Sequence, residues 1–381
     1  MPPDRDVTDG ARADRHLKIA IAAHERAIVS RAAGRFASAE RDCRRALGGY
    51  TAAEGARHPD VANALVELAS VLEARDRPVE AAQALRRALV ILRPPDDDLD
   101  LDLDLLRLRL RARLAQSGLD RARGAYGAAN RNGQAALAEA RRRLPRRDPL
   151  VVASLNNLGV LRKAEGRYGD ALAYYRRALP LLARGDRQAR ATLEHNLGGI
   201  MHARGRFAEA EPHARRAVAL RAAALGASHP AWAADVAALA AVVESRGRFA
   251  EAAQLYRRSQ AVFRRKLGTR SLEYGLGLAG LAAVEQQRGE AARARVLYEE
   301  ALPNLQRHLG RHHPDVALTV NNLAVLERNE ERPARAEALF RRAAASFGRA
   351  LGARHPHTIL ARDNLRAVRA GRLKRTGVTR R

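Results

Sequence analysis

Residues 205–210 read Gly-Arg-Phe-Ala-Glu-Ala, and residues 247–252 repeat the same six letters. Variants of the first three letters occur eight times, beginning at Gly34, Asp76, Gly124, Gly166, Gly205, Gly247, Gly289 and Glu331. The successive spacings are 42, 48, 42, 39, 42, 42 and 42 residues. A fixed period of this length is typical of a solenoid, in which one supersecondary unit recurs and packs on its neighbours. The sequence therefore predicts a repeat array.

Small and large apolar residues keep fixed places within each repeat. When the first residue of the recurring phrase is numbered 15, positions 8, 20 and 27 are Ala, Ser or Gly in all eight repeats. Position 7 is Leu in six repeats, and position 24 carries Tyr175, Tyr256, Tyr298 and Phe340. The apolar spacing fits a period near 3.6, which indicates two amphipathic helices per repeat. We call them helix A and helix B, and the small residues predict close contact between their backbones.

The ends of the predicted helices carry recurrent signals. Leu-Gly pairs at 225–226, 267–268, 309–310 and 351–352 predict helix ends with Gly in the left-handed cap conformation. His-Pro pairs at 58–59, 229–230, 313–314 and 355–356 predict restarts, because Pro is favoured in the first turn of a helix. Each repeat is therefore expected to read helix A, tight turn, helix B, Gly stop and Pro start.

The composition excludes several functional classes. The apolar content of 46% suffices for a continuous core, and Cys43 is the single cysteine, so no intramolecular disulfide is expected. Neither a signal peptide nor a membrane span is expected, which predicts a soluble, cytoplasmic protein. No phosphate-binding glycine loop, nucleophile elbow or metalloprotease motif is present, so we expect neither an enzyme nor a cofactor. The net charge of +27, carried mostly by Arg, favours anionic partners or else reflects a GC-rich genome.

The repeat resembles the tetratricopeptide repeat, specifically the 42-residue type found in kinesin light chains. The resemblance depends on phrases such as Leu155-Asn156-Asn157-Leu158-Gly159, residues 205–212 and Leu309-Gly310 followed by His313-Pro314-Asp315, and it covers roughly residues 17–372. It implies an all-α, right-handed α-solenoid of about eight helix–turn–helix repeats plus a C-terminal capping helix. It also implies a non-catalytic scaffold or adaptor that binds a peptide or protein segment on the concave surface lined by the A helices. The sequence does not identify that partner.

The predicted boundaries follow from the recurring phrase. Residues 1–15 are expected to form a disordered arm, 16–372 the solenoid, and 373–381 a basic tail. The repeats are expected at 16–58, 59–95, 96–148, 149–186, 187–229, 230–271, 272–313 and 314–355, with the cap at 356–372. Repeat 3 is six residues too long and contains Pro94, Pro95 and six Asp alternating with Leu. We expect a loop leading into a deviant helix A, although the alternation over 99–110 has a strand period, and a joint or an acidic strip are alternatives.

In the resembling family, Asn on helix A grips the backbone of an extended peptide, since its amide both donates and accepts. The matching candidates here are Asn156, Asn157, Lys163, His195, Asn196, His202, Asn321, Asn322, Arg328, Asp363 and Asn364. Repeats 6 and 7 have Ala237-Ala238 and Ala279-Gly280 instead, so we expect two polar clusters separated by an apolar stretch. The alternative is that position-6 Asn merely braces adjacent helices, which makes the position-5 residues Asn156 and Asn321 the better functional candidates.

A second hypothesis is a regulator that binds nucleic acid or another polyanion. Arg pairs recur at positions 25 and 26 and are expected on the outer face of helix B. The candidate anion-binding residues are Arg141, Arg142, Arg143, Arg146, Arg147, Arg176, Arg177, Arg215 and Arg216. Aromatic residues for base stacking are not interleaved with them, so a solvated helix face is the ordinary interpretation. A third possibility is the sensor arm of a larger signalling system.

Two further features favour structural roles. Cys43 lies at a core position and is expected to pack rather than react. His308, His312 and His313 have a spacing that could hold a metal, but His313 belongs to the recurring His-Pro junction, so no metal site is expected.

Overall fold

The computed structural model describes residues 5–93 and 102–375, and it describes side chains for residues 12–93 and 102–371. All regular secondary structure in these ranges is helical. The chain divides into two compact units, Met1–His229 and Pro230–Arg381, and each is described by itself.

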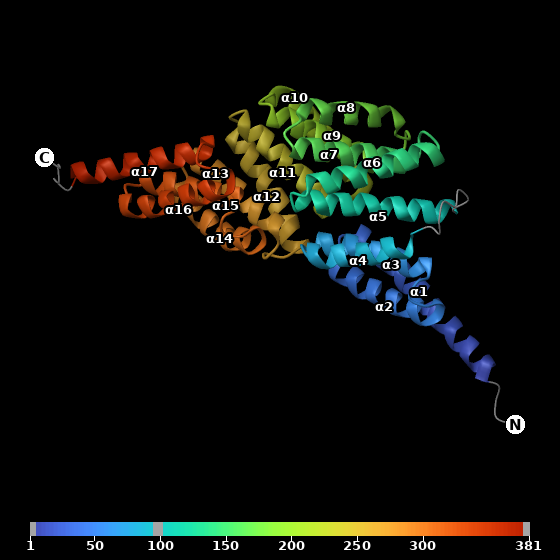
Figure 1. The fold of residues 1–381 in the computed structure, drawn as a ribbon. Coiled ribbons are helices and arrows are strands. Elements are labelled where there is room, and N and C mark those ends of the chain that lie inside the picture. Colours follow the sequence, from blue (N-terminus) through green and yellow to red (C-terminus); the bar gives the residue numbers. More distant parts are fainter. Residues whose placement is uncertain (1–4, 94–101, 376–381) are drawn as a thin grey trace. The chain divides into compact units, whose positions relative to one another are not determined.

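Unit 1 contains five helical pairs in chain order (Figure 1). Each A helix packs on its own B helix, and consecutive pairs pack on one another. The bounds are α1 Arg5–Ala32, α2 Phe36–Glu54, α3 Pro59–Ala74, α4 Pro78–Ile91, α5 Leu103–Ala122, α6 Tyr126–Arg143, α7 Pro149–Ala164, α8 Tyr168–Ala178, α9 Arg187–Ala203 and α10 Phe207–Leu225, with the 3-10 turn η1 at Leu179–Leu181 after α8. Repeat 4, which has the shorter spacing, ends in η1, and Pro180 lies inside this turn.

Unit 2 continues the same arrangement with three pairs and a final single helix. The bounds are α11 Pro230–Ser245, α12 Phe249–Lys266, α13 Leu272–Gln287, α14 Ala291–Leu309, α15 Pro314–Asn329, α16 Pro333–Leu351 and α17 Pro356–Arg375. Val368 of α17 packs with Ala324, Ala336 and Phe340 of repeat 8. The predicted C-terminal cap is therefore confirmed, and the all-α repeat architecture with it.

The tight turn at position 15 explains the recurring phrase. Six repeats place Gly there with φ between 71° and 80°. Asp76 and Glu331 adopt φ of 57° at the same place in repeats 2 and 8. Because a side chain is disfavoured at positive φ, the turn selects Gly, and the two exceptions carry backbone strain.

The small residues lie where helix A meets helix B, as predicted. All eight position-20 alanines are fully buried, and Ala27, Ala69 and Ala240 at position 8 are as well. At Gly159 a Cβ atom would lie 2.3 Å from the Tyr175 ring, so the ring occupies the space that a side chain would need. Close packing of this kind leaves no room for larger residues.

The Gly stops differ in detail from the expectation. Gly226, Gly310 and Gly352 have φ of 82°, 83° and 91°, but their ψ values are 156°, 153° and 163°. This conformation is not the left-handed helical one that the Leu-Gly pattern predicts. It belongs to a region of positive φ and extended ψ that is almost restricted to Gly. The sequence therefore predicted the positive φ of these glycines correctly, but the predicted ψ was wrong.

Three boundary expectations can be compared with the structure. α1 begins at Arg5, so most of the expected arm at 1–15 is helical rather than disordered. Repeat 3 enters α5 at Leu103, as the loop-and-helix interpretation expects, and Asp102 caps that helix by accepting from the Asp104 amide at 3.0 Å. Residues 94–101 and 376–381, which contain most of the Asp run and the tail, lie outside the described residues. Unit 1 includes repeats on both sides of repeat 3, and the division of the chain falls at Pro230. A joint at repeat 3 stays a prediction from the sequence.

Candidate functional site

The position-6 asparagines brace neighbouring helices. Asn157 of α7 donates from Nδ2 to the Leu114 carbonyl oxygen at 3.2 Å, and its Oδ1 accepts from Ser117 Oγ at 2.7 Å. Asn322 is hydrogen-bonded to the Tyr298 hydroxyl. These amides are used within the repeat array, which supports the bracing alternative for this position.

Asn156, at position 5, has a different environment. It is half-buried and accepts a hydrogen bond from Asn196 Nδ2 at 2.8 Å, which ties α9 to α7. It also lines a cavity of about 360 Å³ between these two A helices, together with Val152, Ala153, Asp186, Thr192 and other residues. Apart from Asn156, the lining residues of α7 are apolar, and polar groups come from Asp186, Gln188 and Thr192 at the start of α9. Such a combination can hold a chain segment by its backbone and one apolar side chain.

Arg221 of α10 holds the part of α9 that lines this cavity. It is 7% exposed and donates to the Gln188 carbonyl oxygen at 3.3 Å and to Thr192 Oγ1 at 3.2 Å. Sequence reasoning did not identify Arg221, since it belongs to helix B and to no recurrent Arg pair. The cavity wall is therefore held in place without a ligand, which reduces the ordering that binding would require.

The other three candidates of unit 1 lie on the same A helices. Lys163, His195 and His202 are all half-buried. The His202 ring packs on Phe207, with ring centroids 5.3 Å apart. Burial, with a smaller contribution from Arg121, lowers the pKa of Lys163.

The candidates of unit 2 differ in exposure, from the buried Asn321 to the exposed Arg328 and Asp363. Asn321 is only 7% exposed, and its Oδ1 is buried without a partner among the described residues. Arg328 donates to Asn364 Oδ1 at 3.1 Å and lies 5.9 Å from the Phe340 ring centroid. Asp363 forms an exposed ion pair with Arg366 at 3.3 Å. Asn321 thus offers less surface than Asn156, although the sequence gives them the same repeat position.

A relation between positions 12 and 24 was not found from the sequence. In repeat 6 the Tyr256 hydroxyl at position 24 donates to Glu244 at position 12, at 3.3 Å. In repeat 7 the Tyr298 hydroxyl donates to Gln286 at 3.0 Å. In these two repeats the position-24 tyrosine of helix B therefore directs its hydroxyl to the position-12 side chain of helix A. The only signal in the sequence is the joint occurrence of Tyr and a polar residue 12 positions earlier.

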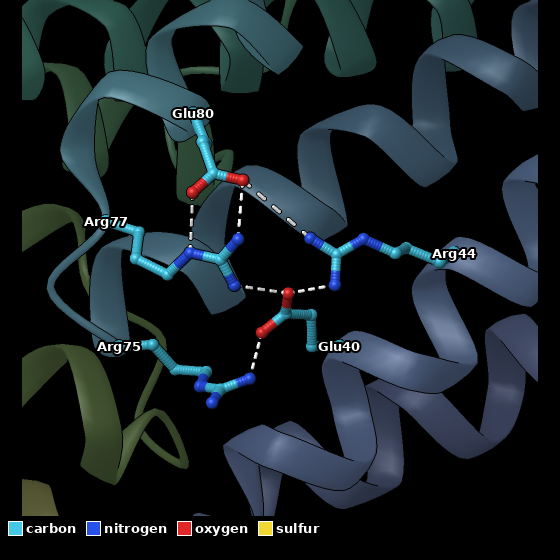
Figure 2. A network of polar contacts seen from close by, with 5 residues as sticks. All are labelled: Glu40, Arg44, Arg75, Arg77 and Glu80. Carbon is cyan, nitrogen blue, oxygen red and sulfur yellow. Dashed lines mark hydrogen bonds and ion pairs between the residues drawn. The ribbon is translucent and has the colours of Figure 1, made fainter.

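The Arg ladder is exposed, as predicted, but many of its members are paired within the chain. Glu40 is 1% exposed and binds Arg44 of its own helix together with Arg75 and Arg77 of repeat 2, as Figure 2 shows. Arg257 binds Glu285 of the next repeat, and Arg215 and Arg341 bind Glu211 and Glu337 one turn earlier. This pairing reduces the charge that the ladder offers to a polyanion.

The candidate anion-binding residues differ in their surroundings. Arg215 and Arg216 are in ion pairs with Glu211 and Glu194, at 2.7 Å and 3.1 Å. Arg177 lies over the Tyr174 ring at 5.6 Å from its centroid. Arg141, Arg142, Arg146, Arg147 and Arg176 are exposed, and Arg143 is half-buried. The set is a dispersed surface rather than one recess.

The remaining reactive residues have structural roles. Cys43 is 1% exposed, and burial raises the pKa of its thiol to about 12, which makes it a poor nucleophile. His308 contacts the Arg270 carbonyl oxygen, and His312 contacts Ser346 and Arg349. His313 caps α15 by accepting from the Asp315 amide at 3.2 Å. The three histidines thus each bind a different neighbour.

Comparisons with known proteins agree with this architecture. Family models described as tetratricopeptide repeat match residues 18–93, 154–190, 189–265, 232–307 and 274–347. Because these ranges cover more than half of the chain, the chain belongs to the tetratricopeptide-repeat family. A search of curated proteins finds no significant match.

Solved structures with a TM-score above 0.5 share the fold at low sequence identity. The Rap protein complexed with Competence and Sporulation Factor is 11% identical, with 92% of this chain and 98% of that chain covered and a TM-score of 0.57. A chain of the APC/C hetero-tetramer Cut9–Hcn1 is 14% identical with a TM-score of 0.54, and the match covers 86% of this chain but only 59% of that one. A Podosopora anserina putative kinesin light chain with nearly identical TPR-like repeats is 18% identical, with 64% and 97% covered and a TM-score of 0.32. Among the described residues, every helix is too short or too polar to traverse a lipid bilayer.

Proposed function

We propose that this protein is a non-catalytic scaffold or adaptor that binds an extended peptide or protein segment on the A helices of repeats 4 and 5. The observation that carries the proposal is the cavity between α7 and α9, with Asn156 in its wall. The Oδ1 atom of Asn156 accepts a hydrogen bond from Asn196. Its Nδ2 group would donate to a backbone carbonyl of the ligand. The volume of about 360 Å³ is sufficient for one or two side chains of a bound segment.

The fold supports this proposal in a general way. Stacked repeats present long surfaces suited to extended ligands. The similar Rap protein was solved in a complex, with Competence and Sporulation Factor. The intramolecular pairing of the Arg ladder gives less support to a polyanion as the partner. A cytoplasmic location stays a prediction from the sequence.

The experiment is a selection of displayed random peptides on the immobilised full-length protein. We expect selected peptides to bind the wild type and to lose affinity for Ala153→Leu, which fills the cavity from α7. Ala37→Leu, an exposed alanine of α2, is the matched control and should bind as the wild type does. Selected peptides that bind both variants equally would place the site elsewhere and contradict the proposal.

A further inference from the structure

A histidine and two carboxylates meet where repeat 1 joins repeat 2. Glu54 is the last residue of α2, His58 caps α3, and Asp60 lies in the first turn of α3. His58 Nδ1 lies 2.9 Å from Glu54 Oε2 and 3.6 Å from Asp60 Oδ2, and one ligand atom from each of the three residues lies within 4.8 Å of the other two. Within the described ranges, no other group of three His, Cys, Asp or Glu side chains converges in this way. The sequence expectation of no metal site concerned residues 308–313, which do not belong to this group.

The hydrogen bonds of the junction do not account for this convergence. In its capping role His58 Nδ1 accepts from the Asp60 amide at 3.3 Å, so this nitrogen carries no proton that it could donate to Glu54. Glu54 Oε2 is closed off from solvent and accepts no hydrogen bond from the described residues. Two atoms with lone pairs therefore face each other at 2.9 Å. A buried acceptor is costly unless a donor or a cation compensates it.

Glu54 departs from the repeat pattern at this junction. At the other three His-Pro junctions the residue four positions before His is Leu, namely Leu225, Leu309 and Leu351. The His313 junction is otherwise the same, because its Nδ1 accepts from the Asp315 amide at 3.2 Å and lies 3.6 Å from Asp315 Oδ2. The cap therefore forms without a glutamate, and the third ligand atom is what distinguishes the first junction.

The donor set suits a divalent transition-metal cation. Zn²⁺ binds imidazole nitrogen at about 2.0–2.1 Å and carboxylate oxygen at about 2.0–2.2 Å, usually in a tetrahedron. The ligand atoms of such a tetrahedron lie about 3.3–3.6 Å apart. The two distances measured from His58 Nδ1 are close to this range, so small side-chain movements suffice to enclose the ion. Because Ca²⁺ and Mg²⁺ prefer oxygen ligands, the imidazole favours Zn²⁺ over them.

We propose that Glu54, His58 and Asp60 form a binding site for a divalent transition-metal cation such as Zn²⁺. The cation takes the Nδ1 lone pair in place of the long hydrogen bond from the Asp60 amide, and it lies between the two negative carboxylates. Three protein ligands leave a fourth coordination position for a water molecule. Because Glu54 ends α2 and the other two ligands begin α3, the bound ion links repeat 1 to repeat 2. This site lies on other repeats than the cavity beside Asn156 and does not depend on the proposed function.

The first test compares two histidines of the same protein. The side chains of His58 and His313 are each 39% exposed and have the same capping role, so they are matched except for the carboxylate of Glu54. Diethyl pyrocarbonate modifies an imidazole nitrogen with a free lone pair, and mass spectrometry reports each histidine separately. On untagged full-length protein, we expect a small excess of Zn²⁺ to slow the labelling of His58 about fivefold or more and to leave His313 unchanged. Unchanged labelling of His58, or equal protection of both histidines, would overturn the proposal.

Zinc titrations of variants test the ligand set. Glu54→Leu introduces the residue that the other junctions have, and Asp60→Asn keeps the shape of the side chain, so we expect both variants to fold, as circular dichroism can verify. Each should weaken Zn²⁺ binding at least about tenfold, since even the loss of an outer-shell partner costs about 10–100-fold. Asp315→Asn is the matched control and should bind Zn²⁺ as the wild type does. Wild-type affinity in either ligand variant would overturn the assignment of that ligand.

The converse substitution tests whether the three residues are sufficient. Leu309→Glu supplies the missing carboxylate beside His313 and Asp315, so Zn²⁺ should then slow the labelling of His313 as well. If His313 stays unprotected in this variant, the three residue types at this spacing do not by themselves make the site, which counts against the proposal.

Thermal unfolding gives a readout that does not depend on labelling. Zn²⁺ should raise the unfolding midpoint of the wild type, because an ion that binds only the folded chain stabilises it, and it should not raise that of Glu54→Leu. Mg²⁺ and Ca²⁺ at the same concentration should raise neither midpoint. An equal rise in both proteins would place the bound Zn²⁺ elsewhere. A wild-type rise with Mg²⁺ or Ca²⁺ equal to that with Zn²⁺ would overturn the choice of a transition metal.

Discussion

Asn156 and Asn157 are adjacent in α7, yet their side chains meet different surroundings. Asn157 is directed toward α5 and uses both ends of its amide there. Asn156 is directed toward α9 and the cavity. Because a helix turns by about 100° per residue, the side chains of two adjacent residues face different neighbouring helices. At the scale of single residues, therefore, both asparagines link α7 to a neighbouring A helix, and Asn156 also lines the cavity.

Asn157→Ala should destabilise the protein by about 1–2 kcal/mol, because buried groups of α5 lose their partners. Asn156→Ala should change stability little and weaken binding of the selected peptides. Urea unfolding followed by circular dichroism and peptide titration measure the two effects. Equal losses of stability in both variants would contradict this division of roles.

Gly159→Ala should destabilise unit 1 by about 1–3 kcal/mol, since the added Cβ would lie 2.3 Å from the Tyr175 ring. Gly118 of α5 is the control, because a Cβ atom there meets nothing within 4 Å. Gly118→Ala should be neutral or stabilise by about 0.5–1 kcal/mol through helix propensity. The two midpoints of thermal unfolding give the comparison, and similar shifts for both variants would count against the close-packing explanation.

At the scale of helices, buried carboxylates link consecutive repeats. Glu40, Glu67, Glu285 and Glu327 are each at most 2% exposed, and each binds arginines from a neighbouring repeat. The arginine heads reach these carboxylates from partly exposed positions, so their stems cover the helix surface. Such pairs fix which residues of adjacent repeats face each other.

Glu40→Gln should destabilise unit 1 by about 2 kcal/mol at pH 7. Burial alone would raise the pKa of Glu40, but hydrogen bonds from Arg77 and Arg44 and the charge of Arg75 hold it below 4.5. A lowered carboxyl pKa stabilises the fold above the unfolded-state value, and this stabilisation is lost as the pH falls through the folded-state value. The difference between wild type and Glu40→Gln should therefore shrink as the pH falls below 4.5.

Urea midpoints at pH 7 and in acid check this prediction. Glu80, which binds Arg77 at 2.6 Å but is 45% exposed, is the control. Glu80→Gln should change stability by less than about 1 kcal/mol, because exposed ion pairs contribute little. A Glu40→Gln effect that persists unchanged in acid would show that charge is not its cause.

The His-Pro junction is a helix cap. His58 and His355, like His313, accept through Nδ1 from the backbone amide two residues on, at 3.3 Å and 3.2 Å. His58→Ala should destabilise the protein by about 1 kcal/mol, while His58→Asn should retain most of the stability. Thermal unfolding of both variants tests the cap. If Asn fails to rescue, the ion pair of His58 with Glu54 at 2.9 Å would be the more important contact.

At the scale of the whole molecule, the net charge of +27 is distributed over both units and is partly matched by internal pairs. The positive excess raises the rate of encounter with anionic molecules without selecting among them. We therefore expect a specific partner to be recognised by local geometry, such as that of the cavity beside Asn156.

The full-length protein should bind random DNA and RNA weakly, with little binding near physiological salt. Titrations at two salt concentrations measure this, since a protein that neutralises many phosphates loses affinity steeply as salt rises. Micromolar affinity with a steep negative salt slope would instead favour the polyanion hypothesis based on the Arg surface.

The sequence by itself determined the repeat period, the helix pairs, the turns and the small residues between helices. These features depend on residues within one repeat. Because the same pattern of small, apolar and turn residues recurs in eight repeats, it can be recognised from the sequence alone. The A-helix location of Asn156 and Lys163 followed from the same pattern. The Leu-Gly pattern also predicted the positive φ at the helix ends, because glycine adopts positive φ without steric cost.

Only the tertiary structure decided which of the polar residues form hydrogen bonds or ion pairs with a neighbouring repeat. Asn157 meets Leu114, and Glu40 meets Arg75 and Arg77, across 35 to 43 residues of chain. Contacts at this separation depend on how one repeat is rotated on the next, which no local spacing specifies. The Tyr175 hydroxyl is a further example, because it has no partner among the described residues whereas the equivalent hydroxyls of Tyr256 and Tyr298 donate to polar side chains of helix A.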